Sequence, residues 1–256
     1  MKNRAFHFLF VLITSVFFAL FSTHGFSQDS LKKLIVTPLI GDFYIYTTFG
    51  DPGNGSAYPA NGMYLVTTEG VVLFDTPWDT TQFLPLLHHI EKSHHQKVVI
   101  CFATHFHEDR TAGLEFYRKK GIKTYTSKLT DEWSVKKQQP RAEFLMFKDT
   151  LFQIGTYQFE MIYPGPGHAP DNIVFWFDKE KILYGGCLIK SKDDRHLGNL
   201  SDANIDEYAN SLKKLKMKCL NPGYVIPGHN SWSDPSSLEH TLKMAERAKR
   251  KKKKKN

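Results

Sequence analysis

The segment ATHFHEDRTAG, residues 103–113, places two histidines and two acidic residues within five consecutive positions, directly after the apolar run KVVICFA. On an extended backbone successive side chains point to opposite faces, so His105, His107 and Asp109 are predicted to lie on one side. Imidazole and carboxylate groups both bind zinc. A polar loop that carries histidines without a metal is the alternative, but the aspartate two residues beyond the H-x-H pair favours a metal site.

Three further potential ligands each follow a different predicted strand. His168 lies in the turn YPGPGHAPDN, Cys187 comes directly after ILYGG, and His229 comes directly after YVIPG. Any one of them alone is more typical of a structural residue. Because strand ends on one rim of a sheet lie close together, these residues and the HFHED segment are predicted to form a single site.

Six candidate ligands are more than one zinc ion uses. A tetrahedral zinc takes four ligands, and a catalytic zinc keeps three protein ligands and one open position. The six groups therefore divide into two sets of three, which is the composition of a two-metal hydrolytic site. A thiolate ligand also accounts for the odd cysteine among three. Cys101 and Cys219 are predicted to be free core thiols, and whether they pair is left open. The remaining histidines beyond residue 30 are predicted to be solvated: His88, His89, His94, His95, His196 and His240.

Strand-rich segments alternate with helices in both halves of the chain, which places the candidate ligands at strand-to-loop junctions. Two packed sheets with helices on their outer faces are the simplest layering for this pattern. Residues 50–61 form a Gly- and Pro-rich loop that is predicted to be mobile. Paired strands and hairpins are predicted within 34–49 and 62–76, and further strands at 97–104, 143–147, 151–154, 157–163, 172–177, 181–184 and 223–228. Helices are predicted at 79–95, 109–121, 127–138, 204–217 and from 236 onward.

The first 27 residues have the pattern of a secretory signal. Lys2 and Arg4 precede an apolar stretch, and Gly25 and Ser27 are the small residues before a predicted cleavage site. A retained membrane anchor is the alternative, but the stretch is at the short limit for spanning a bilayer. Residues 28–256 are predicted to form one domain, because their number suits a single sizeable core, with two small domains as the alternative.

The net charge of +8 comes from the two ends of the chain. Eight basic residues form a C-terminal tail at about 247–256, and two more leave with the signal. The remaining body has 24 basic and 26 acidic residues, so the charge gives no evidence of a basic binding face. Contact of the tail with nucleic acid or an anionic membrane is one interpretation, but a frayed, solvated end is favoured. We expect no nucleic-acid partner and no stable membrane insertion after signal cleavage.

Taken together, the motifs resemble those of the metallo-β-lactamases. They are the H-x-H-x-D motif, a Gly-His pair, a Gly-Gly-Cys-x-x-Lys segment and a Pro-Gly-His segment, in the family's order along essentially the whole mature chain. More narrowly, they are similar to the di-zinc, broad-spectrum subclass with a cysteine in its second metal site. Related thioesterases and glyoxalase-type hydrolases usually carry histidine where this chain has Arg110, and aspartate where it has Cys187.

The resemblance implies a four-layer αββα sandwich with two zinc ions at one edge between the sheets. It also implies zinc-dependent hydrolysis of the β-lactam amide bond of penicillins, cephalosporins and carbapenems, and hence antibiotic resistance. The implied partners are these small molecules, the implied location is the periplasm, and we expect a monomer. The resemblance assigns His105, His107 and His168 to the first zinc, and Asp109, Cys187 and His229 to the second.

Further roles follow from the resemblance. Lys190 would bind the antibiotic carboxylate, Asn199 would bind the lactam carbonyl and assist catalysis, and Asp109 would orient the nucleophile. A surface lysine and a turn residue are the alternatives for the first two. Asp75, in LFDTPWD, matches a buried aspartate beneath the metals. The loop at residues 50–60 corresponds to the family's flap over the substrate, but its glycine-rich tip lacks a large aromatic residue.

Two other functions remain compatible with the sequence. One is a metal-dependent hydrolase of the same fold that acts on thioesters or phosphoesters. The other is a secreted zinc-binding protein without catalytic activity.

Overall fold

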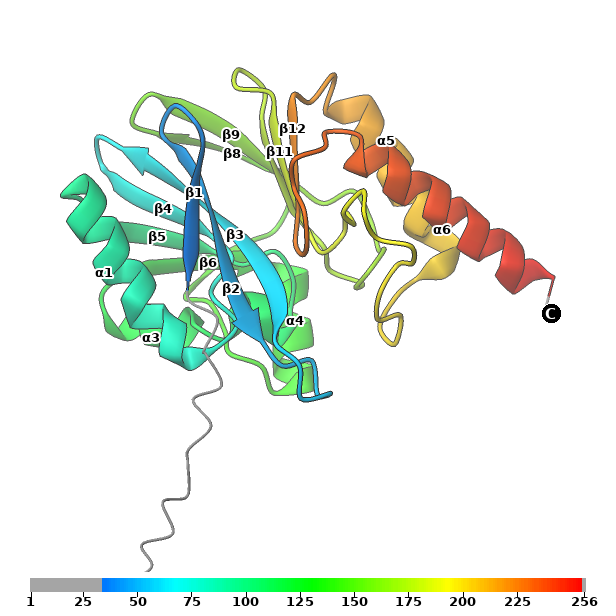
Figure 1. The fold of residues 1–256 in the computed structure, drawn as a ribbon, viewed down its shortest axis with the longest axis horizontal. Helices are drawn as coiled ribbons and strands as arrows, with labels where there is room; N and C mark the ends of the chain where they lie inside the picture. The colour runs from blue at the N-terminus through cyan, green and yellow to red at the C-terminus, as the bar shows by residue number, and fades with distance from the viewer. Residues whose placement is uncertain (1–33, 255–256) are drawn as a thin grey trace, which may run out of the picture. The chain divides into compact units, whose positions relative to one another are not determined.

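A computed structural model of the chain describes residues 34–254. The predicted signal and its cleavage site lie outside the described residues. Two β-sheets pack face to face, and helices cover the outer face of each sheet (Figure 1). This confirms the predicted αββα arrangement. Between residues 34 and 254 no helix combines the length and the apolar composition needed to cross a bilayer.

The first sheet has seven strands that follow one another in sequence order. Neighbours from β1 to β4 are antiparallel, and neighbours from β4 to β7 are parallel. The parallel part brings the C-terminal ends of β4, β5 and β6 to one edge. The strands are β1 (Ile35–Ile40), β2 (Phe43–Gly50), β3 (Tyr58–Thr67), β4 (Gly70–Phe74), β5 (Val98–Phe102), β6 (Lys123–Ser127) and β7 (Phe144–Met146).

The second sheet has five strands in the order β12-β11-β10-β9-β8. Only β11 and β12 are parallel, so both strands end at the same edge, with Cys187 and His229 just beyond them. The other pairs are antiparallel. The strands are β8 (Thr150–Ile154), β9 (Tyr157–Ile162), β10 (Val174–Phe177), β11 (Ile182–Gly186) and β12 (Tyr224–Pro227).

The core between the sheets is built from registered rows of apolar side chains. Met63 on β3 pairs with Phe74 on β4, which pairs with Phe102 on β5. The Phe74 ring meets Phe175 of the second sheet at a centroid separation of 4.9 Å. Full burial of each such side chain contributes about 1.5–3 kcal/mol. This packing holds the two sheets, and therefore their strand ends, in one fixed relation.

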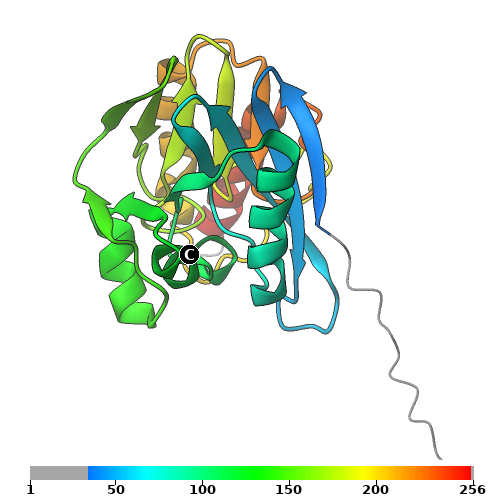
Figure 2. The same ribbon diagram turned by 90° about the vertical axis from the view of Figure 1, so that its left-hand side faces the viewer.

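The alternate side chains of the same strands face the helices. Leu73 and Cys101 pack with Phe83 and Leu86 of α1 (Phe83–His94) on the outer face of the first sheet. Figure 2 shows this helix lying in front of the strands of that sheet. On the outer face of the second sheet, α5 (Ile205–Lys218) and α6 (Ser237–Lys253) pack in the same way. The remaining helices are η1 (Thr80–Gln82), α2 (Glu108–Thr111), α3 (Leu114–Lys119) and α4 (Lys128–Lys137).

The ends of the longer helices follow local sequence signals. The Ser127 hydroxyl accepts from the Thr130 backbone N–H at the start of α4, and Gln138 ends that helix in the left-handed conformation. The Asn204 side chain accepts from the Glu207 backbone N–H in the same way at the start of α5. The predicted bounds of these two helices are therefore close to the observed ones.

Two predicted elements differ from the structure. The helix predicted at 109–121 is divided into α2 and α3, because the Gly113 backbone N–H donates to the Thr76 hydroxyl instead of continuing the helix. Where a frayed segment was predicted from about residue 247, the chain is helical as far as Lys253, the end of α6. Lysine and arginine are good helix formers, and cations are favourable near a helix C-terminus.

Candidate metal centre

The six predicted ligands come together at the edge where the parallel strands of both sheets end. His105 and His107 follow β5, and His168 lies in the loop after β9. Cys187 and His229 directly follow the parallel pair β11 and β12. The side-chain donor atoms form overlapping groups within 4.8 Å of one another. These groups are His105–His107–Asp109, His105–His168–Cys187 and Asp109–Cys187–His229.

The three histidines of the first predicted set face one another. Nε2 of His105 and Nδ1 of His107 are 3.0 Å apart. The same Nδ1 of His107 is 3.2 Å from Nε2 of His168. Burial, the largest cause, lowers the pKa of His105 and His168 well below its usual range, so both are neutral at pH 7. Neutral imidazole is the form that binds a metal.

The second predicted set is equally close. Oδ2 of Asp109 and Nε2 of His229 are 3.1 Å apart, and Sγ of Cys187 is 3.2 Å from the same nitrogen. The chain passes Cys187 so closely that a Cβ on Gly228 would be 2.7 Å from its sulfur. Glycine is therefore required in the Pro-Gly-His segment for the thiol and the imidazole to meet.

The structural reason for the position of Asp109 differs from the prediction. The strand β5 ends at Phe102, and Asp109 lies on the short helix α2 rather than on extended backbone. The turn of that helix, and not strand alternation, brings its carboxylate to the histidines. Burial by itself raises the pKa of Asp109, but Arg110 and His229 outweigh burial and hold this pKa well below its usual range.

The donor set fits zinc. Ring nitrogens, a carboxylate oxygen and a sulfur converge within 4.8 Å in each group, from side chains that are mostly buried. Nitrogen, sulfur and carboxylate donors in sets of three are the usual ligands of a catalytic zinc. These groups are typical of zinc sites, and the predicted metal-binding character of the edge is thereby supported.

Arg110 is a site residue whose contacts the sequence did not reveal. Its guanidinium is buried and lies 2.9 Å from Asp109 and 3.3 Å from Asp75. Nη1 donates to the Asn61 carbonyl oxygen and Nη2 to the Gly228 carbonyl oxygen, each at 2.7 Å. The arginine therefore joins both sheets beneath the second set of ligands. The sequence signal for this role would have been the position of Arg110 directly after Asp109, because no other lysine or arginine stands near Asp109 in the sequence.

Asp75 lies fully buried under the cluster, at the end of β4. Its φ of 67° is in the left-handed region, which is strained for a non-glycine residue. Its carboxylate accepts from the Thr104 backbone N–H (2.7 Å), the Thr104 hydroxyl (3.0 Å) and the Tyr184 hydroxyl (2.7 Å). Asp75 contacts the residue before His105 and the arginine beside Asp109, so it positions both sets indirectly.

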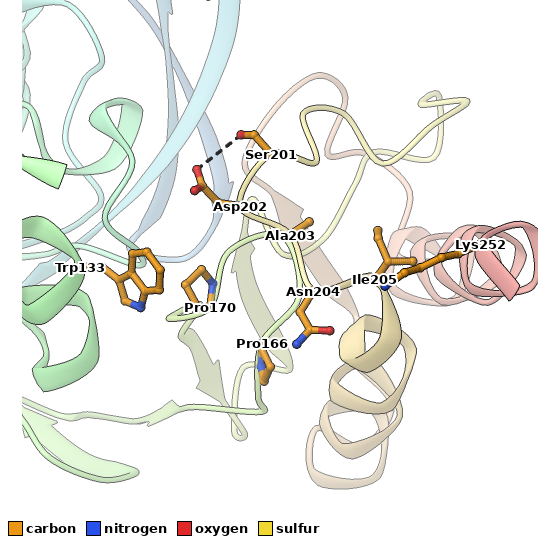
Figure 3. A pocket seen from close by; sticks show the side chains of 9 residues that line it. All are labelled: Trp133, Pro166, Pro170, Ser201, Asp202, Ala203, Asn204, Ile205 and Lys252. Atoms are coloured by element: carbon orange, nitrogen blue, oxygen red, sulfur yellow. Dashed lines mark hydrogen bonds between the residues drawn. The ribbon is translucent and has the colours of Figure 1, made fainter. Parts of the chain in front are cut away.

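Asp202 is a second residue that the sequence did not predict for the site. Its Oδ2 is 3.1 Å from Nε2 of His107, and its Oδ1 accepts from Nζ of Lys137 at 2.9 Å. Carboxylates in this position fix the orientation of metal-binding imidazoles. Asp202 also lines a cavity of about 470 Å³. Figure 3 shows Trp133 of α4 on one side of this cavity and the segment 201–205 on the other.

The predicted substrate-binding residues occupy different surroundings. Lys190 is buried, and no hydrogen bond or ion pair to its Nζ occurs within residues 34–254. Burial lowers its pKa, while Cys187, Asp194 and Asp109 act in the opposite direction. Asn199 is exposed, and its Oδ1 accepts from the Ser201 backbone N–H at 3.0 Å, as in the turn alternative. Its role in catalysis therefore stays a prediction.

Aromatic side chains lie beside the cluster although the loop tip has none. The hairpin between β2 and β3 is glycine-rich at Gly53 and Gly55, as predicted. At its base, the Tyr58 ring is 5.1 Å from the His229 ring, and the Trp78 ring is 6.2 Å from it. These two rings supply an apolar wall close to the second set of ligands.

The other cysteines and histidines stay outside the cluster. Cys101 and Cys219 are free and buried, as predicted. Nε2 of His94 is 2.9 Å from the Tyr64 hydroxyl, and Nε2 of His240 is 2.7 Å from the Asp194 carbonyl oxygen, so these two are hydrogen-bonded rather than only solvated. Among residues 34–254, neither joins a group of metal-binding donors.

The fold and the site define a metallo-hydrolase with ligands at the sheet edge, and comparison with known proteins gives its family. A family model, the metallo-β-lactamase superfamily, matches residues 56–229, which contain all six candidate ligands. The chain belongs to this family, and the resemblance predicted from the motifs is confirmed.

Individual relatives cover most of the chain. The chain is similar to a type 2 metallo-β-lactamase of Elizabethkingia meningoseptica, with 39% identity over 86% of this chain and 87% of the relative. It is also similar to metallo-β-lactamase IND-1 of Chryseobacterium indologenes, with 40% identity over 86% of this chain and 92% of the relative. The crystal structure of metallo-β-lactamase IND-7 matches with a TM-score of 0.80 and 40% identity, covering 84% of this chain and 99% of that one.

Proposed function

We propose that this protein hydrolyses the amide bond of β-lactam antibiotics, namely penicillins, cephalosporins and carbapenems, and so confers resistance. The observation that carries the proposal is the meeting of six donors at one sheet edge, in a chain whose relatives at 39% and 40% identity are metallo-β-lactamases. Family membership alone allows other substrates, so the substrate class rests on these relatives and on the Asp–Cys–His set.

We further propose that the site holds two zinc ions. His105, His107 and His168 would bind the first, and Asp109, Cys187 and His229 the second. The support is that each set has its own short contacts, at 3.0 and 3.2 Å in the first and 3.1 and 3.2 Å in the second. When bound, zinc would act as a Lewis acid and would lower the pKa of a coordinated water molecule to about 7.

Asp109 has a second task besides binding metal. Because its pKa is held well below the usual range, its carboxylate stays ionised and only accepts hydrogen bonds. It therefore accepts a hydrogen bond from the O–H of an attacking water. This hydrogen bond turns the lone pair of the water oxygen toward the lactam carbonyl carbon. The Asn199 amide would donate to the carbonyl oxygen, where negative charge develops in the transition state.

Lys190 would anchor the substrate carboxylate. Its ammonium is free of hydrogen bonds and ion pairs within the described residues. Burial lowers its pKa, but Cys187 and Asp109 are close enough to oppose this effect, so the ammonium lies near the second set of ligands. The side chain is largely buried and its ammonium has no protein partner among residues 34–254, so the ammonium is available to an incoming anion. A carboxylate on the substrate would be that anion, and this places the antibiotic over both sets of ligands.

Replacing Lys190 by alanine is expected to raise KM for a cephalosporin by about 10–100-fold, since a hydrogen bond to a charged group contributes about 1.5–3 kcal/mol. The value of kcat should change far less, because the contact exists in both the ground state and the transition state. Steady-state kinetics with a cephalosporin and with its carboxylate ester separate the effects, since only the free acid should respond. An unchanged KM for the acid, or an equal change for the ester, would remove Lys190 as the anchor. Lys192→Ala is the matched control, because Lys192 is exposed two residues further on.

Zinc uptake at pH 7 is expected to release a proton from Cys187. Burial, opposed by Arg110, raises the pKa of this thiol to about 12 in the metal-free protein, so it is protonated at pH 7 and must ionise to become a ligand. This contribution makes zinc affinity rise with pH at every pH below about 12. Titration calorimetry in buffers of different ionisation enthalpy counts the protons. A count of zero as the second site fills would contradict thiolate binding.

The deciding experiment for the proposed function is direct. The purified protein is loaded with zinc, its metal content is measured, and a chromogenic cephalosporin, a carbapenem and a thioester are offered in turn. Hydrolysis of the lactams is expected. Turnover of the thioester alone would assign the protein to another activity of the same fold, and no turnover by fully loaded protein would leave a zinc-binding protein.

We also propose that residues 1–27 direct export and are removed, that residues 28–256 form one metallo-hydrolase domain, and that this domain acts as a monomer in the periplasm. The support for export and cleavage is the sequence pattern of the leader. N-terminal sequencing of protein from the periplasmic fraction tests the cleavage, and sedimentation tests the oligomeric state.

A further inference from the structure

The C-terminal half of α6 carries its basic residues on two different faces. On one face, Lys252 forms an ion pair with the Asp206 carboxylate, and Nζ of Lys249 donates to the Asp206 backbone oxygen at 2.6 Å. The hydrogen bond from Lys252, with added effects of Lys249 and Lys253, lowers the pKa of Asp206. This face is therefore the one that packs against the start of α5.

The other face is a basic stripe, which we define as Arg247, Arg250, Lys251 and Lys254. The spacing i, i+3, i+4, i+7 places these side chains along one side of the helix. All four are exposed. Within residues 34–254, none of the four forms an ion pair with a carboxylate, and the neighbouring Glu246 is held at 2.8 Å by Lys213.

The stripe has the character of a docking surface. Over seven residues it spans about 10 Å along the helix, and four like charges at this spacing repel one another unless anions lie beside them. The body of the protein supplies little counter-charge to the stripe, because Asp206 lies on the other face and Glu246, whose pKa is lowered by Lys213 and also by Arg250, is paired with Lys213. In Figure 1 the last turns of α6 lead away from the two sheets, so the stripe is accessible.

The chemistry of the stripe favours a lipid surface over nucleic acid. No aromatic side chain interleaves with its cations, whereas single-stranded nucleic acid is commonly held by stacking on aromatic rings. The apolar side chains of α6, such as Leu238, Leu242 and Ala245, are buried against the second sheet and α5. The helix therefore has no apolar face left to insert, and contact with a bilayer is limited to electrostatic attraction at the surface.

We propose that the basic stripe of α6 docks this protein peripherally on membranes that carry anionic phospholipid. Without the eight basic residues of the whole C-terminal tail, the mature chain has 24 basic and 26 acidic residues, so the rest of the chain offers no net attraction to such a surface. The stripe is therefore the side that meets the membrane. Lys252, on the opposite face of α6, lines the same cavity as Asp202 (Figure 3), so docking through the stripe leaves this cavity uncovered. This proposal does not depend on the substrate of the enzyme.

The test uses the mature, zinc-loaded protein without a tag, in flotation with phosphatidylglycerol–phosphatidylcholine vesicles and with pure phosphatidylcholine vesicles. Binding is expected only to the anionic vesicles, and it should weaken as salt is raised. A variant with Arg247→Gln, Arg250→Gln, Lys251→Gln and Lys254→Gln should bind at least about 100-fold more weakly, since each cation near an anionic surface contributes several-fold to binding.

The matched control is a variant with Lys92→Gln, Lys119→Gln, Lys123→Gln and Lys148→Gln. These four lysines are exposed and lie off the stripe, so the net charge changes equally. The control should bind anionic vesicles like the wild type, and both variants should keep their hydrolytic rate and circular dichroism. Equal binding by the two variants, no binding by the wild type, or tighter binding of the wild type to an oligonucleotide than to the anionic vesicles would overturn the proposal.

Discussion

Replacing Cys187 by serine is expected to lower kcat/KM for a cephalosporin by more than about 100-fold. Mutating a residue that only hydrogen-bonds to a metal ligand already costs about 10–100-fold in metal affinity or activity, and the loss of a ligand itself should cost more. A serine hydroxyl keeps its proton at neutral pH, so the variant would offer no anion in place of the thiolate. Asp109 and His229 would then be left as a two-residue set. Bound zinc per chain and steady-state kinetics, measured on the same preparation, test this expectation.

The matched control is Cys219→Ser. This thiol is also buried, but it ends α5 and packs in the cluster between that helix and the second sheet. Its replacement changes the same atoms without reaching the metal centre, so zinc content and the rate per folded chain should stay at the wild-type level. If Cys187→Ser kept two zinc ions and a near-normal rate, Cys187 would not be a ligand.

Replacing Arg110 by methionine is expected to lower the free energy of unfolding of the metal-free protein by about 3–5 kcal/mol, the usual cost of breaking a buried ion pair from one side. The guanidinium faces two buried carboxylates, Asp75 and Asp109, and it is buried itself. Without it, both carboxylates lose their counter-charge and two backbone carbonyls lose a donor. Urea unfolding in the presence of a chelator measures the effect, because bound zinc would add stability of its own.

Two further variants sharpen this test. Arg110→Lys keeps the charge but cannot reproduce the planar fork of donors. Its free energy of unfolding should therefore fall between those of the wild type and of Arg110→Met. Arg118→Met removes an exposed arginine of α3, for which no ion pair occurs within residues 34–254, and it should have little effect. A loss of less than about 1 kcal/mol for Arg110→Met, within the range of a surface ion pair, would contradict the buried network.

Much of the site was predictable because it depends on local patterns. Metal-binding residue types stand directly after apolar strands, and the alternation of strands and helices predicts two covered sheets. The three ligand types at four strand ends were sufficient to predict one site, and the motif order predicted the family. The bounds of α4 and α5 were also close, because Ser127, Gln138 and Asn204 cap these helices through contacts within a few residues.

Other features depended on residues far apart in the chain. Asp109 reaches the cluster from α2 rather than from a strand, since Gly113 bonds to Thr76 and breaks the expected longer helix. The contact of Asp202 with His107 joins residues 95 positions apart. The periodicity of apolar residues in the sequence cannot predict this contact, because the contact depends on how the two sheets stack.

The sequence by itself determined which side chains are able to bind metal, which strand ends carry them, and that the C-terminal end is strongly basic. Only the tertiary structure decided that Arg110 is buried between Asp75 and Asp109, and that the basic end is a helix with one face held by Asp206. The physical reason is the range of the interactions. Residue type, capping and alternation act over a few positions, whereas the burial of a charge is settled by packing between segments that meet only after folding.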